Sequence, residues 1–500
     1  MQLTLDAVET KVKSLLLQYS KEYTQNGKPQ LTLRFTGGWV RDKLLERPSH
    51  DIDVAIDHAT GEEFATGLHE YMTRLGLNEI GVHKIASNPD KSKHLETATT
   101  RICGLDIDFV NLRSEEYVTN SRVPTVKFGT PLEDALRRDA TLNALFYNLS
   151  TGEVEDFTEH GIEDLKAGIL RTPMDPDETF SDDPLRVLRF LRFVGQLGFD
   201  IAGESLSAME AQKVGNFLQQ KVSSERVGLE MTKLLESDHP FKAIEYLLDL
   251  GLGPFVFSTT PKPNEEKPKL EKPPKKTKTN AKSNKQPEKP TEADSELPGD
   301  ENVTSENLKK ATASYKSIYN TFEVGLLPKQ ERCILWLAVL LQKLRFLSHS
   351  SALSPVQSIL TASLKMPNVI KDGAISLLNS MAIFDQLKDS GNSRLQLGLF
   401  VREVGPHWPL AIVLNAARLA ADGKPITKAI TVRDEINEAK LDKAYSIKPM
   451  LNGNMMMKIL DKKSGGPWLA PLLKKSVEYQ ISNPECTLDD LKKYILSISD

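Results

Sequence analysis

Residues 50–56 read HDIDVAI, a short run in which acidic and apolar side chains alternate. Alternation with a period of two is typical of a β-strand that has one apolar face. In such a strand Asp51 and Asp53 point to the same face, because side chains two residues apart share a side. Two like charges next to each other on a half-buried face are unfavourable unless a positive group compensates them. The stretch therefore predicts a strand whose acidic face lies against such a group.

The segment before it, RFTGGWVRD, indicates what that face could bind. We expect a strand, a turn at Gly37 and Gly38, and a helix from Trp39. Glycines let the backbone approach a ligand closely, and a nearby helix N-terminus favours a phosphate. A phosphate cradle followed by two aspartates predicts a metal–nucleotide site, in which Asp51 and Asp53 hold two Mg²⁺ ions. The alternative is a plain turn before a solvated edge strand.

A second pair of aspartates, Asp106 and Asp108, occurs in the run LDIDFVNL. In a strand, Ile107 and Phe109 would face the core while both acids face outward. If this strand neighbours the first, Asp108 could be a third carboxylate that accepts the proton of an attacking hydroxyl. A plain amphipathic strand explains the pattern equally well.

The segment RRDATLNALFYN contains Arg137, Arg138, Asp139 and Asn143. We expect a helix here whose buried side is formed by Leu136, Ala140, Leu142 and Leu145. The two arginines would then be exposed toward a phosphate or a ribose, and Asn143 has the donor and acceptor that a ribose hydroxyl needs. A surface charge cluster is the structural alternative.

The segment SDDPLRVLRFLRF predicts a second informative helix, capped by Ser181. Asp183, Arg186 and Arg189 follow one another at intervals of three residues, so neighbours share a face of that helix. An apolar stripe at near-helical spacing is formed by Leu185, Leu188, Leu191 and Val194. The alternative explanation of this spacing is a ladder of ion pairs within the helix.

An Asp–Arg pair can recognise a nucleotide base, because Asp only accepts hydrogen bonds and Arg only donates them. Cytosine and adenine each present a donor beside an acceptor, which matches this edge. Guanine and uracil reverse the order, and buried polar groups left unpaired make their rejection effective. Asp183 and Arg186 beside a metal–nucleotide site therefore predict selection of CTP and ATP without a nucleic-acid template.

Composition excludes several classes of protein. The chain has 500 residues, 39% hydrophobic and 26% charged, as is ordinary for a soluble globular protein. No apolar run approaches the roughly 20 residues that span a bilayer, so we expect no membrane segment. The net charge of −4 argues against a uniformly basic, DNA-coating surface. The three cysteines are far apart, which fits a reducing compartment and gives no disulfide framework.

The order of strand and helix patterns predicts an α+β protein in four parts. Residues 1–155 contain the strand-like runs and form a small sheet domain, the head. All-α domains follow, which we call the neck (156–235), the body (236–400) and the tail (401–500). Residues of about 258–307 are rich in Lys and Pro and nearly free of apolar side chains, so we expect disorder there. A spacer, a nuclear-import signal or an RNA-attracting arm would each explain that insert.

The ordered set of motifs resembles the class II tRNA nucleotidyltransferases, the CCA-adding enzymes, of the eukaryotic type. The resemblance covers residues 33–235 and rests on GGWVRD, HDIDVAI, RRDATLNALFYN, DFTEHGIEDLKAGILRTP, DDPLRVLRFLRF and SSERVGLEMTKLL. It implies a nucleotidyltransferase-type head followed by helical neck, body and tail. The C-terminal GGPWLAPLLKKSVEYQ is also similar to the eukaryotic members. Bacterial poly(A) polymerases share the early motifs, so the reaction type is better supported than the product.

The resemblance implies a role for each matching residue. Asp51 and Asp53 would bind the metals, and the triphosphate-side motif would comprise Gly37, Gly38, Arg41 and Asp42. The ribose motif would comprise Arg138, Asp139 and Asn143, and the base-reading motif Asp183 and Arg186, with Arg189 in the same helix. A hinge would contain Asp156, Gly161, Asp164 and Arg171, and a supporting neck helix would contain Glu225, Arg226 and Glu230. Asp182 departs mildly from the Glu that many members carry, and no HD-type hydrolase motif is present.

These observations predict an enzyme that adds CCA to tRNA from CTP and ATP without a template. The tRNA 3′-hydroxyl would attack the α-phosphate of each nucleotide, and pyrophosphate would leave. The alternatives are a poly(A) polymerase with the same head and a catalytically silent RNA-binding protein on the same fold. We expect a cytoplasmic or nuclear protein, and an upstream start could add a segment that makes a mitochondrial form.

Overall fold

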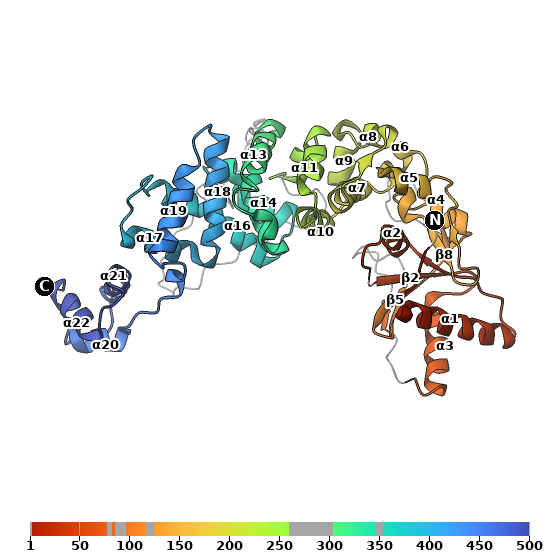
Figure 1. Cartoon of the computed structure of the whole chain (residues 1–500), viewed down its shortest axis with the longest axis horizontal. Helices are drawn as coiled ribbons and strands as arrows, with labels where there is room; N and C mark the ends of the chain where they lie inside the picture. The colour runs from red at the N-terminus through yellow and green to blue at the C-terminus, as the bar shows by residue number, and fades with distance from the viewer. Residues whose placement is uncertain are drawn as a thin grey trace, which may run out of the picture. The chain divides into compact units, whose positions relative to one another are not determined.

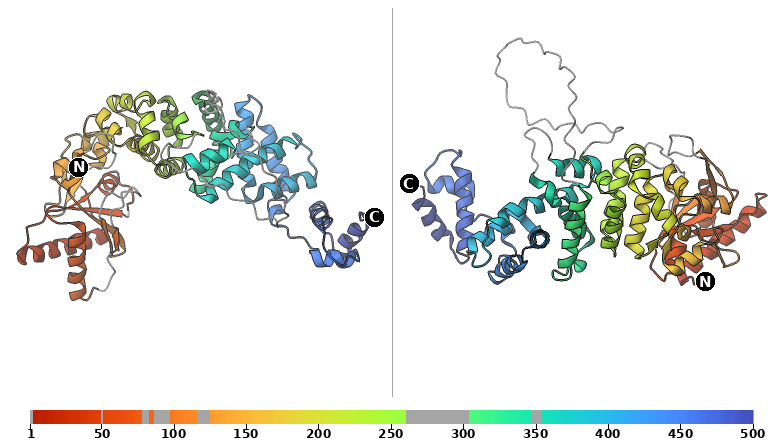
Figure 2. Two further views of the ribbon diagram at one scale, coloured as in Figure 1. Left: turned by 180° about the vertical axis from the view of Figure 1, so that it is seen from behind. Right: turned by 90° about the horizontal axis from the view of Figure 1, so that it is seen from above.

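The computed structural model describes residues 3–49, 51–77, 83–85, 97–116, 125–259, 304–346 and 354–499. The chain divides into two compact units, Met1–Phe255 and Val256–Asp500. In the part of the chain that is described, every strand lies in the first unit, as Figure 1 and Figure 2 show. The prediction of an α+β protein with a sheet domain before helical domains is confirmed.

A seven-stranded sheet organises the first unit, in the order β3-β4-β5-β2-β1-β8-β9. Its strands are β1 Leu33–Thr36, β2 Asp51–Ile56, β3 His83–Ile85, β4 Thr97–Ile102, β5 Leu105–Asn111, β8 Phe146–Asn148 and β9 Val154–Glu155. Strands β2 and β5 are parallel, and the other neighbours in this sheet are antiparallel. The register pairs Asp51 with Asp106 and Asp53 with Asp108. All four carboxylates therefore point to one face of the sheet.

Two helices cover the other face, α1 Ala7–Gln25 and α3 Gly61–Arg74, which lie on one side of β2 and β5 in Figure 1. Ile52, Val54 and Phe109 are fully buried there. A Cβ atom at Gly61 would lie 2.2 Å from the carbonyl oxygen of Phe109, so α3 approaches β5 more closely than other residues would permit. The alternation read from HDIDVAI thus separates a packed face from an acidic one.

The single helix predicted for RRDATLNALFYN is not formed. Helix α4 ends there (Pro131–Leu136), and a short 3-10 turn, η2, covers Thr141–Asn143 before β8 begins. The side chain of Asp139 accepts the backbone N–H of Ala140, a local contact that competes with continuation of the helix. The expected apolar residues are still buried at Ala140, Leu142 and Leu145, whereas Leu136 is only partly buried.

The remaining elements of the first unit are mostly helices. They are α2 Gly38–Leu44, β6 Arg113–Glu116, β7 Thr125–Phe128, α5 Gly161–Ala167, β10 Ile169–Leu170, α6 Pro176–Asp182, α7 Leu185–Leu197, β11 Asp200–Ile201, α8 Gly203–Ala208, α9 Ala211–Lys221, α10 Ser224–Leu235, α11 Pro240–Asp249 and α12 Gly253–Val256. Strands β10 and β11 pair in parallel, so the neck is helical apart from this short ladder.

Helix α7 starts later than predicted. Ser181 lies inside α6, and the carboxylate of Asp183 accepts the N–H of Leu185 at the start of α7. The predicted cap at Ser181 is therefore wrong, because Pro184 separates α6 from α7. The predicted apolar stripe is confirmed, since its residues are buried at Leu185, Leu188, Leu191 and Val194.

The described residues of the second unit are helical. Its α-helices are α13 Ser305–Ile318, α14 Lys329–Leu341, α15 Pro355–Ser358, α16 Asn368–Asp385, α17 Arg394–Val404, α18 Trp408–Ala421, α19 Thr427–Glu438, α20 Gly453–Ile459, α21 Leu469–Ser482 and α22 Leu488–Ser497. The predicted body–tail boundary at residue 400 falls within α17, and the four-part division stays a prediction. Most of the Lys/Pro insert, residues 260–303, lies outside the described residues. None of the described helices is long and apolar enough to cross a bilayer.

Candidate active site

Strands β2 and β5 bring the predicted carboxylates together. Asp51 and Asp53 are exposed, and Asp108 is half-buried beside Asp53 on the parallel neighbour. The hydroxyl of Thr99 on β4 donates a hydrogen bond to Asp108 Oδ1 at 2.6 Å. The geometry therefore supports Asp108 as a neighbour of the pair, because it is held in place from the far side by Thr99.

The negative charge of this cluster is only partly compensated. Desolvation by the surrounding protein has the largest effect on the pKa of Asp53 and raises it, although the side chain keeps contact with solvent. Arg138 lowers the same pKa, whereas Asp108 and Asp51 raise it, and the resulting value is about 6. A bound cation would favour the charged form, so the carboxylate oxygens fit a hard divalent metal.

Such a metal would need ligands beyond the protein. Within the described residues, no three His, Cys, Asp or Glu side chains converge closely enough to hold an ion by themselves. Mg²⁺ usually keeps several waters and is bound through one or two carboxylates and the phosphates of a substrate. Asp51 and Asp53 fit that arrangement.

The turn before α2 places its backbone against this cluster. Gly37 has φ 72° and ψ −142°, a conformation that is almost restricted to glycine. A Cβ atom at Gly37 would lie 3.3 Å from Asp53 Oδ2 and 3.5 Å from Arg138 Nη1. Gly37 is therefore needed both for the backbone conformation and for the space beside Asp53 and Arg138.

The two arginines that we expected to be exposed are mostly buried. Their side chains are 16% exposed in Arg137 and 14% in Arg138, and both form ion pairs with the buried Asp134. Burial would raise the pKa of Asp134, but Arg138 and Arg137 lower it below its usual range. Arg138 Nη1 also donates to the carbonyl oxygen of Asn143 at 2.8 Å. The expectation of an exposed pair is wrong, because a buried carboxylate in α4 binds both cations.

Asp139 and Asn143 connect α2 to α7. Arg41 Nη1 donates to Asn143 Oδ1 at 2.7 Å, and Asn143 Nδ2 donates to Asp139 Oδ1 at 3.0 Å. Arg189 Nε donates to Asp139 Oδ2 at 2.6 Å. Burial would raise the pKa of Asp139, but Arg189 and the hydrogen bond from Asn143 hold it below its usual range. The two ribose candidates therefore form a hydrogen-bonded chain between the glycine turn and the predicted base-reading helix.

Gly38, Arg41 and Asp42 lie in α2, directly after Gly37. Asp42 accepts from Arg41 Nε at 2.8 Å, and Arg41 is itself buried. Gly38 begins α2, where a Cβ atom would lie 3.4 Å from Arg41 Nη2. Arg41 is therefore fixed at the start of α2 by Asp42 and by Asn143, with its guanidinium beside Gly38.

The predicted base-reading residues have contacts outside their own helix. Asp183 forms an ion pair with Arg226 of α10 at 3.2 Å. Arg186 Nη2 donates to the carbonyl oxygen of Arg137 at 2.7 Å. Arg189 pairs with Asp139, as described above. The pairs formed by Asp183 and Arg189 are tertiary contacts, and therefore do not form the ladder within one helix that was the alternative explanation.

Sequence reasoning missed two features of this site. One is Asp134, four residues before Arg138, a spacing that could have suggested the pair. The other is Phe193, a buried ring within 6 Å of the guanidinium groups of Arg41, Arg189 and Arg192. Nothing in the local sequence around Phe193 distinguishes it from an ordinary core residue of α7.

The predicted hinge and supporting residues are also linked to this region. Asp164 accepts from Thr141 Oγ1 at 2.8 Å and forms an ion pair with Arg171 at 3.1 Å. Glu230 of α10 forms an ion pair with Arg192 of α7 at 2.6 Å. The carboxylate of Asp156 accepts the N–H of Ile162, and a Cβ atom at Gly161 would lie 2.8 Å from Leu145. Glu225 lies in the first turn of α10.

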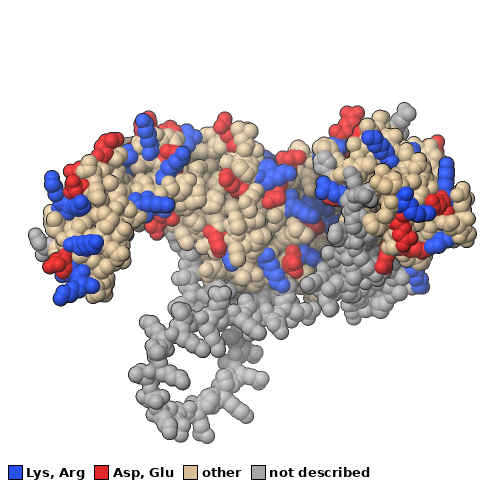
Figure 3. Space-filling model, turned by 90° about the horizontal axis from the view of Figure 1, so that it is seen from below, with Lys and Arg blue, Asp and Glu red and all other residues tan. Residues whose placement is uncertain are grey.

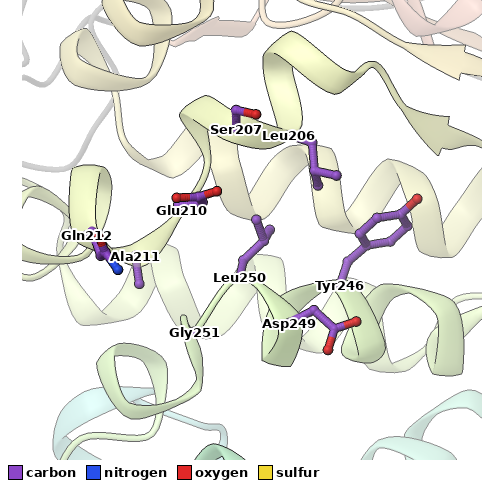
Figure 4. A pocket seen from close by; sticks show the side chains of 9 residues that line it. All are labelled: Leu206, Ser207, Glu210, Ala211, Gln212, Tyr246, Asp249, Leu250 and Gly251. Atoms are coloured by element: carbon purple, nitrogen blue, oxygen red, sulfur yellow. The ribbon is translucent and has the colours of Figure 1, made fainter.

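A separate cavity of about 460 Å³ lies between α8, α9 and α11 (Figure 4). Its walls include the acidic side chains of Glu210 and Asp249 and the ring of Tyr246. None of the residues predicted to act on a nucleotide lines it. The face drawn in Figure 3 shows Lys and Arg side chains interspersed with Asp and Glu, in agreement with the slightly negative net charge.

The sequence matches the family described as "Poly A polymerase head domain" over residues 33–171, and the one described as "Probable RNA and SrmB- binding site of polymerase A" over residues 198–262. The mitochondrial CCA tRNA nucleotidyltransferase of Saccharomyces cerevisiae is 36% identical over 99% of this chain and 94% of its own length. The mitochondrial CCA tRNA nucleotidyltransferase of Candida glabrata is 35% identical over 99% and 96%. The chain belongs to the CCA tRNA nucleotidyltransferase family.

Solved structures of CCA-adding enzymes have the same fold as this chain. The Bacillus stearothermophilus enzyme in complex with CTP has a TM-score of 0.64 at 21% identity and covers 99% of this chain and 98% of its own. The Thermotoga maritima enzyme complexed with tRNA has a TM-score of 0.60 at 17% identity, with both chains fully covered. The resemblance inferred from the motifs is confirmed, and the poly(A) polymerase and silent RNA-binding alternatives are not favoured. The chain is a nucleotidyltransferase, and the enzymes of this family generally use a divalent metal.

Proposed function

We propose that this chain adds C, C and A in order to the 3′ end of tRNA, using CTP and ATP and no nucleic-acid template. The observation that carries the proposal is the juxtaposition of Asp51, Asp53 and Asp108 with the Gly37 turn, in a chain that matches CCA tRNA nucleotidyltransferases along its whole length. The carboxylates account for the reaction type, and family membership accounts for the product.

We assign Mg²⁺ to the carboxylate cluster, with Asp51 and Asp53 as its ligands. When bound, two Mg²⁺ ions would stabilise the attacking and leaving oxygens of an in-line displacement at the α-phosphate. Desolvation and the neighbouring acids raise the pKa of Asp53, so a bound cation would oppose its protonation. Asp108, oriented by Thr99, accepts the proton of the attacking 3′-hydroxyl.

The triphosphate lies along the turn at Gly37 and Gly38, whose backbone can approach it closely. Arg138 supplies the positive charge on that side, since it lies next to the position of a Cβ atom at Gly37. Arg41 lies beside Gly38 and is bonded to Asp42, so both residues stay next to the turn. This assignment explains the glycine at position 37, where a side chain would occupy the space beside Asp53 and Arg138.

Ribose and base are held on the side of α7. Asp139 and Asn143 offer a carboxylate and an amide to the ribose hydroxyls, and both are already oriented by Arg189 and Arg41. Asp183 and Arg186 present the acceptor and donors that match cytosine and adenine. Arg189 acts through Asp139 and positions this edge.

The test is the product formed on a tRNA that lacks its 3′-terminal CCA. With CTP alone we expect two additions, with ATP alone none, and with both the complete CCA end. Long tails from ATP alone would instead identify a poly(A) polymerase. Asp53→Ala should abolish addition without preventing tRNA binding, and unchanged addition would refute the metal assignment.

The tRNA would be held by the helical part of the chain, chiefly by contacts to its backbone and by its shape. A tRNA complex of the similarly folded Thermotoga maritima enzyme supports this partner. The similar fungal relatives are named as mitochondrial, which supports a mitochondrial form of this protein beside a cytoplasmic or nuclear one. The four-part division into head, neck, body and tail is retained as part of the proposal.

A further inference from the structure

Asp134 is a buried carboxylate to which no role has been assigned. It lies in α4, and its side chain is 2% exposed. Removing a charged carboxylate from water is costly unless the charge is paired and hydrogen-bonded. Asp134 meets that condition through three neighbours. Arg138 donates from Nη2 at 2.8 Å and Nε at 3.1 Å, Arg137 donates from Nε at 2.9 Å, and the N–H of Arg113 donates at 3.3 Å.

The first consequence concerns Arg138. Its guanidinium is held by Asp134, by the carbonyl oxygen of Asn143 and by the ring of Phe146 at 4.9 Å. From that position it lies beside Gly37, within 3.5 Å of where a Cβ atom would be. The proposed triphosphate cation therefore owes its orientation to Asp134, because the carboxylate is the one charged group in this set of contacts.

The second consequence concerns Arg186. Its Nη2 donates to the carbonyl oxygen of Arg137, the residue whose side chain Asp134 also holds. The backbone at Arg137 therefore connects the end of α4 to the base-reading residue of α7. Asp134 thus bonds directly to the proposed phosphate contact, Arg138, and is linked through Arg137 to the proposed base contact, Arg186.

We propose that Asp134 is a positioning residue for nucleotide binding, which fixes Arg138 beside the Gly37 turn and, through Arg137, the donor groups of Arg186. The inference rests on the proposed roles of Arg138 and Arg186. It predicts that loss of the carboxylate weakens nucleotide binding and selection while the metal ligands remain in place.

The test compares Asp134→Asn with the wild-type chain in steady-state addition to a tRNA that lacks its CCA end. The asparagine keeps the shape and removes the charge that orients Arg138. Because a charge-assisted hydrogen bond is lost, we expect the KM for CTP and for ATP to rise about tenfold or more, with a smaller change in kcat. Misincorporation of UTP should also rise.

A matched control separates positioning from general loss of stability. Glu155→Gln removes the carboxylate that pairs with the largely buried Arg34 at 2.6 Å in the seven-stranded sheet. Glu155 bonds to Arg34 and Asn148, neither of which is assigned to the nucleotide. We expect a lower melting temperature in this control with an unchanged KM. Equal rises of KM in both variants would overturn the proposal, because the effect would then be structural.

The route through Arg138 is tested by a double-mutant cycle. Arg138→Gln alone should raise the KM for nucleotides, and adding Asp134→Asn should raise it little further. Additive effects would overturn the proposed route. If Asp134→Asn does not fold, Asp134→Glu replaces it, and a KM equal to that of the wild type in a folded Asp134→Glu chain, whose carboxylate is displaced by one methylene, would count against the proposal.

The outcomes also distinguish this inference from the proposed function. If the wild-type chain adds no CCA, the proposed function fails. If Arg138→Gln leaves the KM unchanged while CCA is still added, the proposed role of Arg138 falls, and this inference with it. If Arg138→Gln raises the KM and Asp134→Asn does not, only the role of Asp134 falls.

Discussion

Asp53 on β2 lies directly opposite Asp108 on the parallel strand β5, so two carboxylates from different strands share one face of the sheet. Parallel neighbours in register keep their side chains on the same side. The chain therefore concentrates negative charge beside the Gly37 turn, where Arg138 compensates it only in part.

The first prediction concerns pH and the metal. The pKa of Asp53 is raised from 3.8 to about 6 in the folded chain, so between these values the folded state binds more protons than the unfolded state. In the absence of metal, the contribution of Asp53 to the free energy of unfolding should therefore fall as pH rises through that window. Mg²⁺ should restore it above the window and bind more weakly below it, because its ligand must be deprotonated.

Melting temperatures measured from pH 4 to pH 8, with and without Mg²⁺, check this prediction. Asp53→Asn should raise the melting temperature of the metal-free chain at pH 7 and not at pH 4, and should remove the stabilisation by Mg²⁺. Equal Mg²⁺-dependent shifts in the wild-type and variant chains would exclude Asp53 as a ligand.

A second prediction concerns Gly37. Gly37→Ala should lower stability by about 1–3 kcal/mol, since the backbone conformation is almost restricted to glycine. It should also raise the KM for CTP and ATP, because the new methyl group lies against Asp53 and Arg138. Gly27→Ala is the matched control: its φ is +80°, and a Cβ atom there would meet nothing within 4 Å. Steady-state kinetics in which both variants show the same KM would contradict a role for Gly37 in nucleotide binding.

The base-reading pair makes a third prediction. Asp183→Ala or Arg186→Ala should blur the choice of CTP and ATP over UTP and GTP before it abolishes addition, because the pair supplies the hydrogen-bonding edge. Arg226→Gln should do the same to a smaller degree, since Arg226 holds Asp183. Sequencing of products made with mixed nucleotides measures the effect. Lys213→Gln, which removes an exposed cation paired with Asp177, should leave selection unchanged. Wild-type selectivity in both alanine variants would refute the edge argument.

A fourth prediction concerns the buried pair between Arg192 and Glu230, whose side chains are 12% and 7% exposed. Glu230→Gln should lower stability by about 3 kcal/mol, because it leaves the arginine charge buried without its counter-ion. Glu22→Gln removes an ion pair with the exposed Arg74 in the same unit and should leave stability nearly unchanged, because solvent screens that pair. Thermal unfolding compares the two variants. Similar small losses in both would show that the buried charge is solvated in another way.

Much of the proposed active site could be predicted from local spacing. The strand with Asp51 and Asp53, the turn at Gly37 and the apolar stripe of α7 all appear where the residue pattern places them. They could be predicted because the side-chain period of a strand or helix assigns each residue to a face without knowledge of its partners. The same reasoning failed at Ser181, because Pro184 separates α6 from α7 and the carboxylate of Asp183 accepts the N–H of Leu185 instead.

The sequence alone determined the order of sheet and helices, the acidic face of β2 and the family to which the chain belongs. Only the tertiary structure decided which charges meet. Arg189 pairs with Asp139 from 50 residues away, and Arg226 reaches Asp183 across 43 residues. Likewise the arginine pair expected on the surface is buried against Asp134. The physical reason is that periodicity depends on neighbouring residues, whereas a buried charge binds whichever counter-charge the folded chain brings within hydrogen-bonding distance.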